Sequence, residues 1–378
     1  MEENDIRIVK PVMGGGFGAR QQLHNQPAAA LLSKKIRRPV KLINTREEEM
    51  YASVVRHEMQ THLKFGVTKQ GILTAFQTEF YLNAGPYTTH TPTIVAAASR
   101  KFQYRIPNYL FNGYTVATNG PTAGAFRGYG NSQLTFGREL MMSRIARKLH
   151  LDPVDFRLRN HVKTGEKFPA AASAVTSCGI EKCARRCQEI RREIDEKEGL
   201  ADNEDIRQAW GVSFACHGSG PSSKEGMSSA VILVSDDGGI RLITGSADIG
   251  QGSETMLSQI AAECLGIPLS HVKITAADTG ITPYDTGTFG SSQTYVSGNA
   301  VVLACQDVIQ KLTDALSDCY DSADITFGED KKFHIPSENL CLTLEEAAHQ
   351  VVFGIKGAVI IGNSSYKAKE VPSFASVW

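Results

Sequence analysis

The sequence has no excess of charge of either sign. Its 378 residues include 40 lysines and arginines and 40 aspartates and glutamates, so the formal net charge at pH 7 is zero. A protein that binds nucleic acid or an anionic membrane through its overall electrostatic field needs an excess of basic groups. The charge balance therefore indicates neither kind of partner.

The sequence also lacks long apolar runs. No apolar segment approaches the roughly 20 residues that a membrane-spanning helix requires. The first residues, Met1 to Asp5, are acidic and do not have the basic-then-apolar form of a signal peptide. We therefore expect a soluble, cytoplasmic protein with no membrane and no nucleic acid partner. A chain of this length can bury two domain-sized cores.

The eight cysteines are scattered, which argues against a metal cluster. Cys178, Cys183 and Cys187 lie closest together, but the third cysteine departs from the C-x4-C-x2-C spacing of plant-type ferredoxins. A zinc site requires paired short spacings with more ligands nearby. The alternative is a set of reduced cytosolic thiols at the start of a helix, and the spacing favours it.

One glycine-rich turn lies between a predicted hairpin and a predicted helix. The hairpin comprises Ala230–Val234 and a second strand from Ile240, and the helix comprises Met256–Leu265. A helix that opens directly from a Gly-x-Gly turn presents free backbone N–H groups and a positive dipole end, which suit an anion. Gln251, in the middle of the turn, adds an amide that donates and accepts. A turn with no ligand is the alternative.

Three further glycine-rich loops occur along the chain. They are Gly14–Arg20, Ala125–Gly130 and Gly287–Gln293. In this order and at these separations, the four loops resemble those of the large, molybdopterin-binding subunit of the xanthine dehydrogenase and aldehyde oxidase family. The resemblance extends over nearly the whole chain.

The resemblance implies an α+β fold, with two molybdopterin-binding domains of mixed sheets and helices and the cofactor cleft between them. We place the first domain at residues 1–198, a linker at 199–209 and the second domain at 210–378, because residues 199–205 are polar and without periodicity. The family subunit has a preceding domain and a catalytic glutamate near its far C-terminus. Neither is expected in this sequence, so we expect it to be incomplete at both ends and assign no catalytic residue.

A molybdopterin cofactor is large and polyanionic, so a protein holds it with backbone amides and amide side chains. Glycine lets the backbone approach such a group closely because it has no Cβ. The cofactor contacts that the resemblance implies are Gly15, Gly16, Phe17, Gly18, Phe126, Arg127, Gly250, Gln251, Gly252, Thr288, Phe289, Gly290 and Ser291. The molybdenum is held by the pterin dithiolene, so no protein ligand to the metal is implied. The dinucleotide form of the cofactor, the cytosine form included, is left open.

The implied reaction is the hydroxylation of an aldehyde or N-heterocycle carbon with oxygen from water. Electrons leave through iron–sulfur clusters and FAD on partner chains, and another chain would supply the missing parts, so we expect a molybdenum hydroxylase that is inactive alone. Tyr129 matches an aromatic residue that sandwiches flat substrates, or it belongs to ordinary packing. Gln21 and Val95 stand where xanthine-oxidising members carry a glutamate and an arginine, which puts a purine substrate in doubt.

Two other functions remain open. The first is a truncated, non-catalytic fragment that binds the cofactor poorly. The second is a nicotinamide-binding oxidoreductase, because Gly14, Gly16 and Ala19 fit a loose G-x-G-x-x-A fingerprint. That fingerprint requires an acidic residue about 20 positions further on. Here the expected second strand ends in Asn44-Thr45-Arg46, so the ribose-binding carboxylate is missing.

The hydrophobic pattern also predicts the main elements. Strands are expected at 6–12, 39–44, within 61–83, at 272–274 and at 358–362, and helices at 22–35, 138–149, 153–160, 181–197 and 292–316. The first of these helices is expected to direct Leu23, Ala28, Leu31 and Leu32 toward a core. The last is expected to bury a stripe of Val296, Ala300, Val301, Ala304, Val308 and Leu312.

Overall fold

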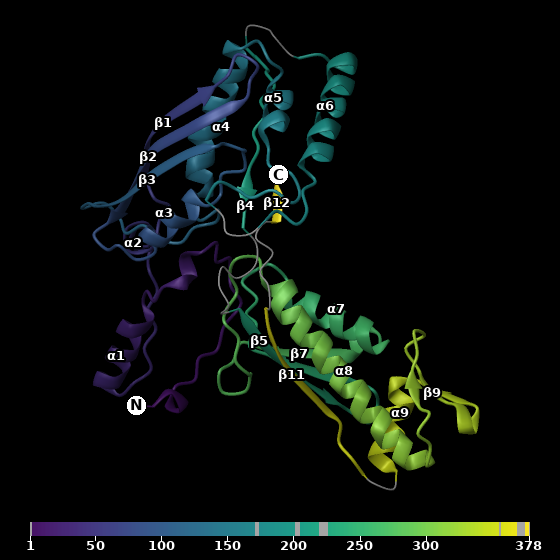
Figure 1. Ribbon diagram of the computed structural model, residues 1–378. Helices are drawn as coiled ribbons and strands as arrows, with labels where there is room; N and C mark the ends of the chain where they lie inside the picture. Colours follow the sequence, from purple (N-terminus) through teal and green to yellow (C-terminus); the bar gives the residue numbers. More distant parts are fainter. Residues whose placement is uncertain are drawn as a thin grey trace. The chain divides into compact units, whose positions relative to one another are not determined.

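The computed structural model describes residues 2–170, 174–200, 205–218, 226–354, 357–368 and 375–377 (Figure 1). These residues form helices and mixed sheets, which confirms the α+β class. They divide into two compact units. Unit 1 comprises Met1–Gly16 and Ser219–Val371, and unit 2 comprises Phe17–Gly218 and Pro372–Trp378. In the described part of the chain, no helix is both long and apolar enough to cross a membrane.

The two units are not consecutive segments of the chain. The N-terminal residues belong to unit 1 because Val9 bridges Asp278 and the Lys10 N–H donates to the carbonyl of Ala277 at 3.0 Å. Arg7 adds an ion pair to Asp278 at 2.6 Å. The compact units therefore do not coincide with the two domains expected on either side of residues 199–209. That domain boundary stays a prediction.

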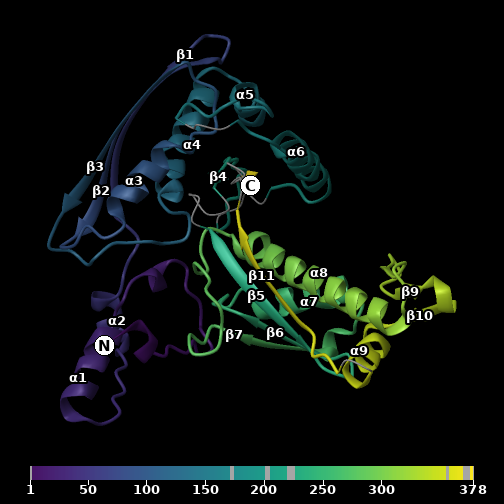
Figure 2. The ribbon, with the colours of Figure 1, turned by 60° about the horizontal axis from the view of Figure 1, so that its bottom comes forward.

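Unit 1 is built on a four-stranded mixed sheet. The strands run in the order β11 (Ile361–Lys367), β5 (Met227–Val234), β6 (Ile240–Thr244) and β7 (Val272–Ala276), and only the β6–β7 pair is parallel. Helices α7 (Ser253–Leu265) and α8 (Gln293–Tyr320) lie side by side on one face of this sheet (Figure 2). Each helix follows a glycine-rich loop, so the sheet positions both loops.

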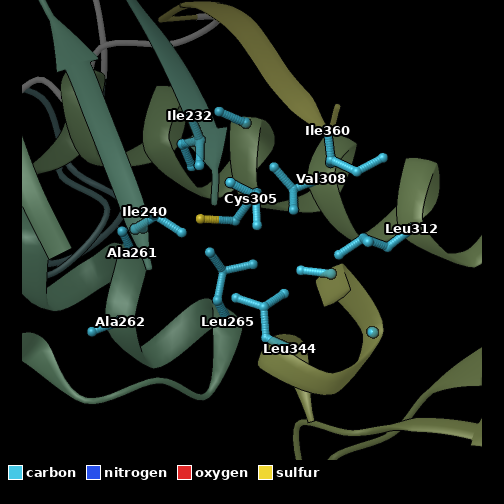
Figure 3. Close-up of a cluster of buried hydrophobic side chains, with 14 of the residues drawn as sticks. Ile232, Ile240, Ala261, Ala262, Leu265, Cys305, Val308, Leu312, Leu344 and Ile360 are labelled. Atoms are coloured by element: carbon cyan, nitrogen blue, oxygen red, sulfur yellow. The ribbon is translucent and has the colours of Figure 1, made fainter. Parts of the chain in front are cut away.

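The core of unit 1 lies between α8 and the sheet (Figure 3). The predicted stripe of α8 is confirmed, since all six of its members are buried. Because the stripe repeats with the period of an α-helix, one face of α8 can remain in contact with the sheet along its length. Gly362 of β11 permits this contact, since a Cβ there would lie 2.4 Å from the carbonyl oxygen of Ala304.

Smaller elements complete unit 1. They are η1 (Glu3–Asp5), η3 (Leu269–His271), β8 (Thr326–Phe327), β9 (Phe333–Ile335), η4 (Pro336–Glu338), β10 (Leu340–Leu342) and α9 (Leu344–Phe353). The three short strands form a sheet of their own in the order β10-β9-β8. One face of this small sheet contributes Phe333, Ile335 and Leu342 to the core of unit 1.

Unit 2 is built on the sheet β1 (Met59–Val67), β2 (Leu73–Gly85) and β3 (Asn108–Ala117). The β1–β2 pair is antiparallel, as the alternation in residues 61–83 predicts, and the β2–β3 pair is parallel. The helices of the unit are α1 (Gln26–Ile36), α2 (Arg46–Ala52), α3 (Thr91–Ser99), α4 (Asn131–Lys148), α5 (Pro153–Asn160) and α6 (Ile180–Lys197), with a 3-10 turn η2 (Ala19–Gln21). Strand β4 (Cys216–His217) pairs with β12 (Ala375–Val377).

Several of the predicted strands and helix boundaries are wrong. Residues 6–12 form only a single bridge at Val9, and residues 39–44 form no strand. Helix α1 begins at Gln26 rather than residue 22, because Pro27 favours the first turn of a helix. The predicted strand at 358–362 begins at Ile361, three residues later than expected.

The expected burial of α1 is also wrong. Leu23, Leu31 and Leu32 are 76%, 67% and 46% exposed, and Ala28 is exposed too. Apolar spacing specifies a helix, but burial requires a second element to cover the face. In the described part of the chain, these side chains stay exposed, so the predicted core face of the helix is not buried.

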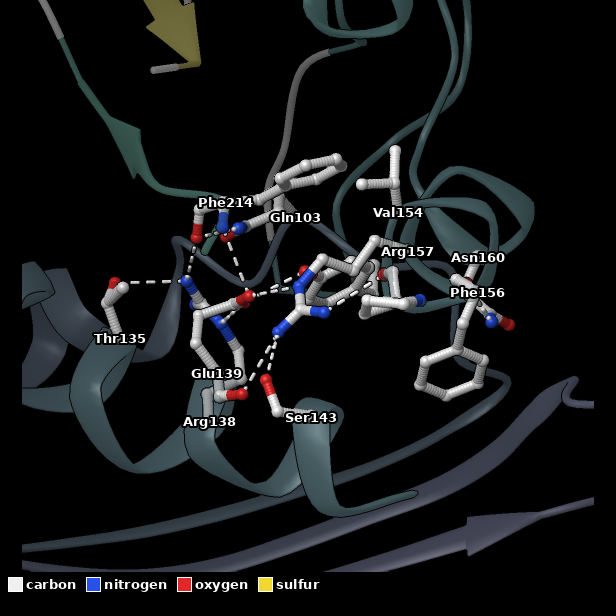
Figure 4. A network of polar contacts seen from close by, with 12 residues as sticks. Gln103, Thr135, Arg138, Glu139, Ser143, Val154, Phe156, Arg157, Asn160 and Phe214 are labelled. Atoms are coloured by element: carbon white, nitrogen blue, oxygen red, sulfur yellow. Dashed lines mark hydrogen bonds and ion pairs between the residues drawn. The ribbon is translucent and has the colours of Figure 1, made fainter. Parts of the chain in front are cut away.

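A buried ionic network fixes the helices of unit 2 (Figure 4). The Glu139 carboxylate accepts hydrogen bonds from Arg157 Nε at 2.7 Å, Arg138 Nε at 3.2 Å and Tyr104 OH at 2.8 Å. It also accepts from the backbone N–H of Phe214 at 3.1 Å. The side chains of Arg138, Glu139 and Arg157 are no more than 5% exposed. Buried charges of this kind are tolerated because each has a partner of opposite sign and further hydrogen bonds.

We predict that Glu139→Gln lowers the free energy of unfolding of the chain by about 3–5 kcal/mol, because it leaves two buried guanidinium groups without a counter-charge. Urea unfolding followed by circular dichroism measures the change. The control is Glu193→Gln on α6, whose side chain is 52% exposed in its pair with Arg186. Equal effects of the two substitutions would show that the network contributes no more than a surface ion pair.

Candidate cofactor site

The turn before α7 has the backbone that its glycines predict. Gly250 and Gly252 have φ angles of 106° and 79°, which L-residues rarely adopt. The sequence analysis missed the role of Asp248, whose carboxylate accepts from the N–H groups of Gly250 at 2.8 Å, Gly252 at 3.4 Å and Glu254 at 3.3 Å. The backbone donors expected to be free for an anion are therefore partly satisfied by this carboxylate.

Asp248 is in turn held from the N-terminal segment. Burial raises its pKa, but the three N–H groups and the nearby Lys10 lower it by more, so the pKa lies below the ordinary value. Lys10 Nζ donates to the carbonyl of Asp248 at 2.9 Å and to Glu254 Oε1 at 3.1 Å. No local pattern could have identified Lys10, because 238 residues separate it from Asp248.

Gln251 projects from this turn with its amide nitrogen weakly held. Its Oε1 accepts from the N–H of Ile249 at 2.7 Å, whereas its Nε2 donates to the carbonyl of Ala247 only at 3.4 Å. The side chain is exposed. Its amide N–H groups are therefore available to a ligand.

Two buried hydroxyls flank the same turn without partners. Ser246 and Ser253 are each 1% exposed, and neither hydroxyl has a hydrogen-bond partner among the described residues. A buried hydroxyl without a partner costs free energy, so such groups indicate a site for a polar ligand or water. The turn thus retains donors for a polar group beyond those that Asp248 occupies.

The loop before α8 is joined to this turn. Thr288 Oγ1 donates to the carbonyl of Ala247 at 2.6 Å and accepts from Gln293 Nε2. Gly290 and Ser291 are exposed and have φ angles of 62° and 55°. Beside them lies a small recess, lined by Gly226, Met227, Asp285, Thr286, Gly287, Phe289, Ser292, Gln293 and Val296. It is far smaller than the roughly 300–1,000 Å³ of a complete small-molecule site.

The first glycine loop reaches the same turn of unit 1. A Cβ on Gly250 would lie 3.7 Å from the carbonyl oxygen of Met13 and 3.8 Å from the backbone nitrogen of Gly15. Gly15 has a φ of 108°, and Gly16 is buried. Unit 1 therefore brings together parts of three predicted loops: residues 13–16, 247–252 and 287–293.

In unit 2, the predicted cofactor residues Phe17 and Gly18 contact the loop that contains Phe126 and Arg127. The N–H of Arg127 donates to the carbonyl of Phe17 at 2.7 Å. Gly18, with a φ of 102°, is required beside them, because a Cβ would lie 2.7 Å from the carbonyl oxygen of Ala125. Arg56, missed in the sequence, donates to the carbonyl of Arg127 at 2.7 Å and lies 4.3 Å from the centroid of the Phe126 ring. The Arg127 side chain itself is exposed.

The three predicted substrate residues are distributed differently. Tyr129 is half-buried with a φ of 44°, and its hydroxyl lies 3.0 Å from His90 Nδ1. Burial raises the pKa of this tyrosine. Val95 on α3 packs against the same hydrophobic cluster as Tyr129. Gln21 is exposed at the end of η2 and is not part of that cluster. Their contact with substrate stays a prediction.

Family models of the molybdopterin cofactor-binding domain match this chain twice, at residues 1–161 and 189–376. The chain belongs to the molybdopterin-binding xanthine dehydrogenase family. The resemblance carried by the four glycine loops is thereby confirmed, and the chain is a molybdopterin-binding subunit or part of one.

Individual relatives support this assignment. The chain is 35% identical over 304 residues to the xanthine dehydrogenase molybdenum-binding subunit of Escherichia coli O157:H7, which covers 78% of this chain and 40% of that protein. It is 33% identical over 196 residues to the nicotinate dehydrogenase large molybdopterin subunit of Eubacterium barkeri, covering 51% and 46%. The aldehyde oxidoreductase of Desulfovibrio gigas superposes with a TM-score of 0.78 at 25% identity, over 97% of this chain and 38% of that one. The chain thus spans about two fifths of the length of the curated relatives it matches.

We predict that Asp248→Ala lowers the free energy of unfolding by about 1 kcal/mol at pH 7, because the first turn of α7 loses the acceptor for its N–H groups. Since the pKa of Asp248 is lowered in the folded state, its contribution is complete above the unfolded value of about 3.9 and declines as the pH falls through the folded value.

The measurement is urea unfolding at several pH values between 2 and 7, with Asp236→Ala in the exposed β5–β6 turn as the control. The difference between wild type and Asp248→Ala should shrink toward the acid end. A difference that is constant with pH would exclude the carboxylate charge as its source.

Proposed function

We propose that this chain is the cofactor-binding part of a molybdenum hydroxylase, and that all four glycine-rich loops contact the cofactor. The observation that carries the proposal is the assembly on unit 1 of residues 13–16, 247–252 and 287–293 around an exposed amide and two buried, unpartnered hydroxyls. Such donors suit the phosphate and pterin oxygens of a polyanionic group. The family assignment names that group as a molybdopterin.

The residues of this chain would hold and orient the cofactor. Gln251 Nε2 can leave its long contact with Ala247 and donate to the cofactor. The exposed guanidinium of Arg127 can neutralise developing negative charge, while Arg56 keeps its backbone in place. The bound cofactor supplies the metal centre at which a C–H carbon is hydroxylated with oxygen from water. Gly252 has open space where a Cβ would lie, so the backbone there can approach such a group closely.

The substrate class that we propose is an aldehyde or an N-heterocycle. The names of the relatives include xanthine dehydrogenase, nicotinate dehydrogenase and aldehyde oxidoreductase. Xanthine, nicotinate and aldehydes each contain an electron-poor C–H carbon. Tyr129 would stack on a flat substrate, with its hydroxyl position fixed by His90. With Gln21 and Val95 in place of charged residues, we do not expect a purine to be the preferred substrate.

The proposed assembly includes iron–sulfur and FAD partner chains that carry electrons away, and a chain or segment that supplies the rest of the molybdopterin domains. The relatives are more than twice as long as the matched region, which supports this need for additional parts. We propose a cytoplasmic location and leave the cytosine dinucleotide form of the cofactor as one option. Without these partners, the chain is not expected to turn over substrate.

The direct test is metal analysis and pterin fluorescence of the complex purified under native conditions. Molybdenum and pterin in equal amounts support the proposal. A complex with neither group supports the non-catalytic fragment, and stabilisation by NADP against heat without molybdenum supports the nicotinamide alternative.

We predict that Gln251→Ala weakens cofactor retention by about 1–3 kcal/mol, which corresponds to roughly 5- to 150-fold, because a buried group of the cofactor loses its amide partner. The fold should be unchanged, since the side chain is exposed and its bonds are confined to its own turn. Molybdenum per chain after extended dialysis of the complex gives the readout.

The matched control is Gln310→Ala, which removes an exposed amide from α8 that bonds only to Asp314 among its described neighbours. It should retain as much molybdenum as the wild type. If Gln251→Ala also retains the wild-type amount, the assignment of Gln251 to the cofactor is wrong.

A further inference from the structure

The small sheet β10-β9-β8 of unit 1 has one face in the core and one in solvent. Alternation along β9 buries Phe333 and Ile335 and directs His334 between them to the outer face. In the antiparallel register, Cys341 of β10 lies directly opposite His334. Two chemically reactive side chains are therefore cross-strand neighbours on an open surface. Neither of them belongs to the glycine-rich loops of the candidate cofactor site.

These two side chains form a hydrogen-bonded series with a carboxylate. Cys341 Sγ lies 3.2 Å from His334 Nδ1, and Asp330 Oδ1 lies 2.8 Å from His334 Nε2. The hydrogen bond with His334 is the largest cause of the lowered pKa of Asp330. The thiol and the carboxylate therefore contact opposite nitrogens of one imidazole ring.

The turn before β9 holds the carboxylate in this position. The N–H of Gly328 donates to the carbonyl of Lys332 at 2.9 Å, and Lys331 adopts a φ of 61°. A Cβ on Gly328 would lie 2.5 Å from Asp330 Oδ1 and 2.6 Å from His334 Nε2. Glycine at this position leaves the space that the Asp330–His334 pair occupies.

The arrangement activates a thiol. Because the ionised carboxylate of Asp330 accepts a hydrogen bond from Nε2–H, the other nitrogen, Nδ1, carries the lone pair that faces the thiol proton. A neighbouring base that can take the proton raises the fraction of nucleophilic thiolate. The site is accessible, since the side chains of His334 and Asp330 are 37% and 50% exposed and Cys341 is exposed.

We propose that Cys341 is an oxidation site for hydrogen peroxide, with His334 as its base and Asp330 as the residue that orients the histidine. The sulfur attacks one oxygen of the peroxide, so the S–O bond forms as the O–O bond breaks. The departing hydroxide takes from His334 the proton that came from the thiol, and water is released. The cysteine is oxidised by two electrons to a sulfenic acid, and the peroxide is reduced by two.

The protein contains its own reference thiols. Cys183 and Cys187 on α6 are also exposed, and neither has a histidine partner among the described hydrogen bonds. An ordinary exposed thiol is only a few per cent thiolate at pH 7. We therefore expect Cys341 to react about tenfold faster than either reference, because only its sulfur has a base within hydrogen-bond distance among these three thiols in the described structure.

The test treats the full chain with substoichiometric hydrogen peroxide at pH 7, traps sulfenic acid with dimedone and quantifies each cysteine by mass spectrometry. Wild type should be labelled mainly at Cys341. His334→Gln should reduce labelling of Cys341 to the level of Cys183 and Cys187, and Asp330→Asn should give an intermediate value. Labelling of the two reference cysteines should not change in either variant.

Circular dichroism of each variant shows whether the fold is retained. A second comparison uses the wild type alone and so does not depend on any variant. Iodoacetamide should alkylate Cys341 before Cys183 and Cys187. Equal rates for the three thiols, or unchanged Cys341 labelling in a folded His334→Gln protein, would overturn the proposal.

Discussion

Close packing of α8 against the sheet and against α7 determines the arrangement of unit 1. Its stripe of small and branched side chains lets the helix approach β11 until only a glycine fits at position 362. Protein interiors are packed too densely for such a helix to slide or rotate freely. The N-terminal ends of α7 and α8 are fixed as a result, and each end follows a glycine-rich loop.

Polar contacts then connect these loops over long distances in the sequence. Lys10 ties the N-terminal segment to the turn before α7, and Thr288 ties the loop before α8 to the same turn. These contacts leave exposed or unpartnered donors on Gln251, Ser246 and Ser253. A set of donors held by rigid elements suits a ligand with many acceptors. In unit 2, Arg56 and Gly18 similarly fix the loop that contains Arg127.

The sequence predicted the elements with strong periodicity and missed those that depend on distant contacts. The stripe of α8 and the β5–β6 hairpin carry their own pattern, so their burial followed from local spacing. The exposed leucines of α1 show the limit of this reasoning, because the pattern does not say whether another element covers the helix. Local pattern identified the glycine turn at Gly250–Gly252, whereas the resemblance to a family connected it with the other three loops.

Asp248, Lys10 and Arg56 were missed for a different reason. Their roles arise from contacts with residues far along the chain or from the geometry of one turn, and neither leaves a periodic signal. The side-chain series Asp330–His334–Cys341 has the same origin, since β9 and β10 must pair before its members meet. A sequence pattern predicts which face of an element is apolar and where the chain turns. Which charged groups pair with one another is known only from the tertiary structure.

We propose that all four glycine-rich loops contact one polyanionic cofactor. Hydrogen–deuterium exchange of the native complex with and without its cofactor tests this claim, because bound backbone N–H groups exchange more slowly than free ones. We expect slower exchange in the cofactor-loaded complex at residues 14–18, 125–130, 248–254 and 287–293, with the outer face of α6 unchanged. Protection that is absent from these segments, or confined to other parts of the chain, would contradict it.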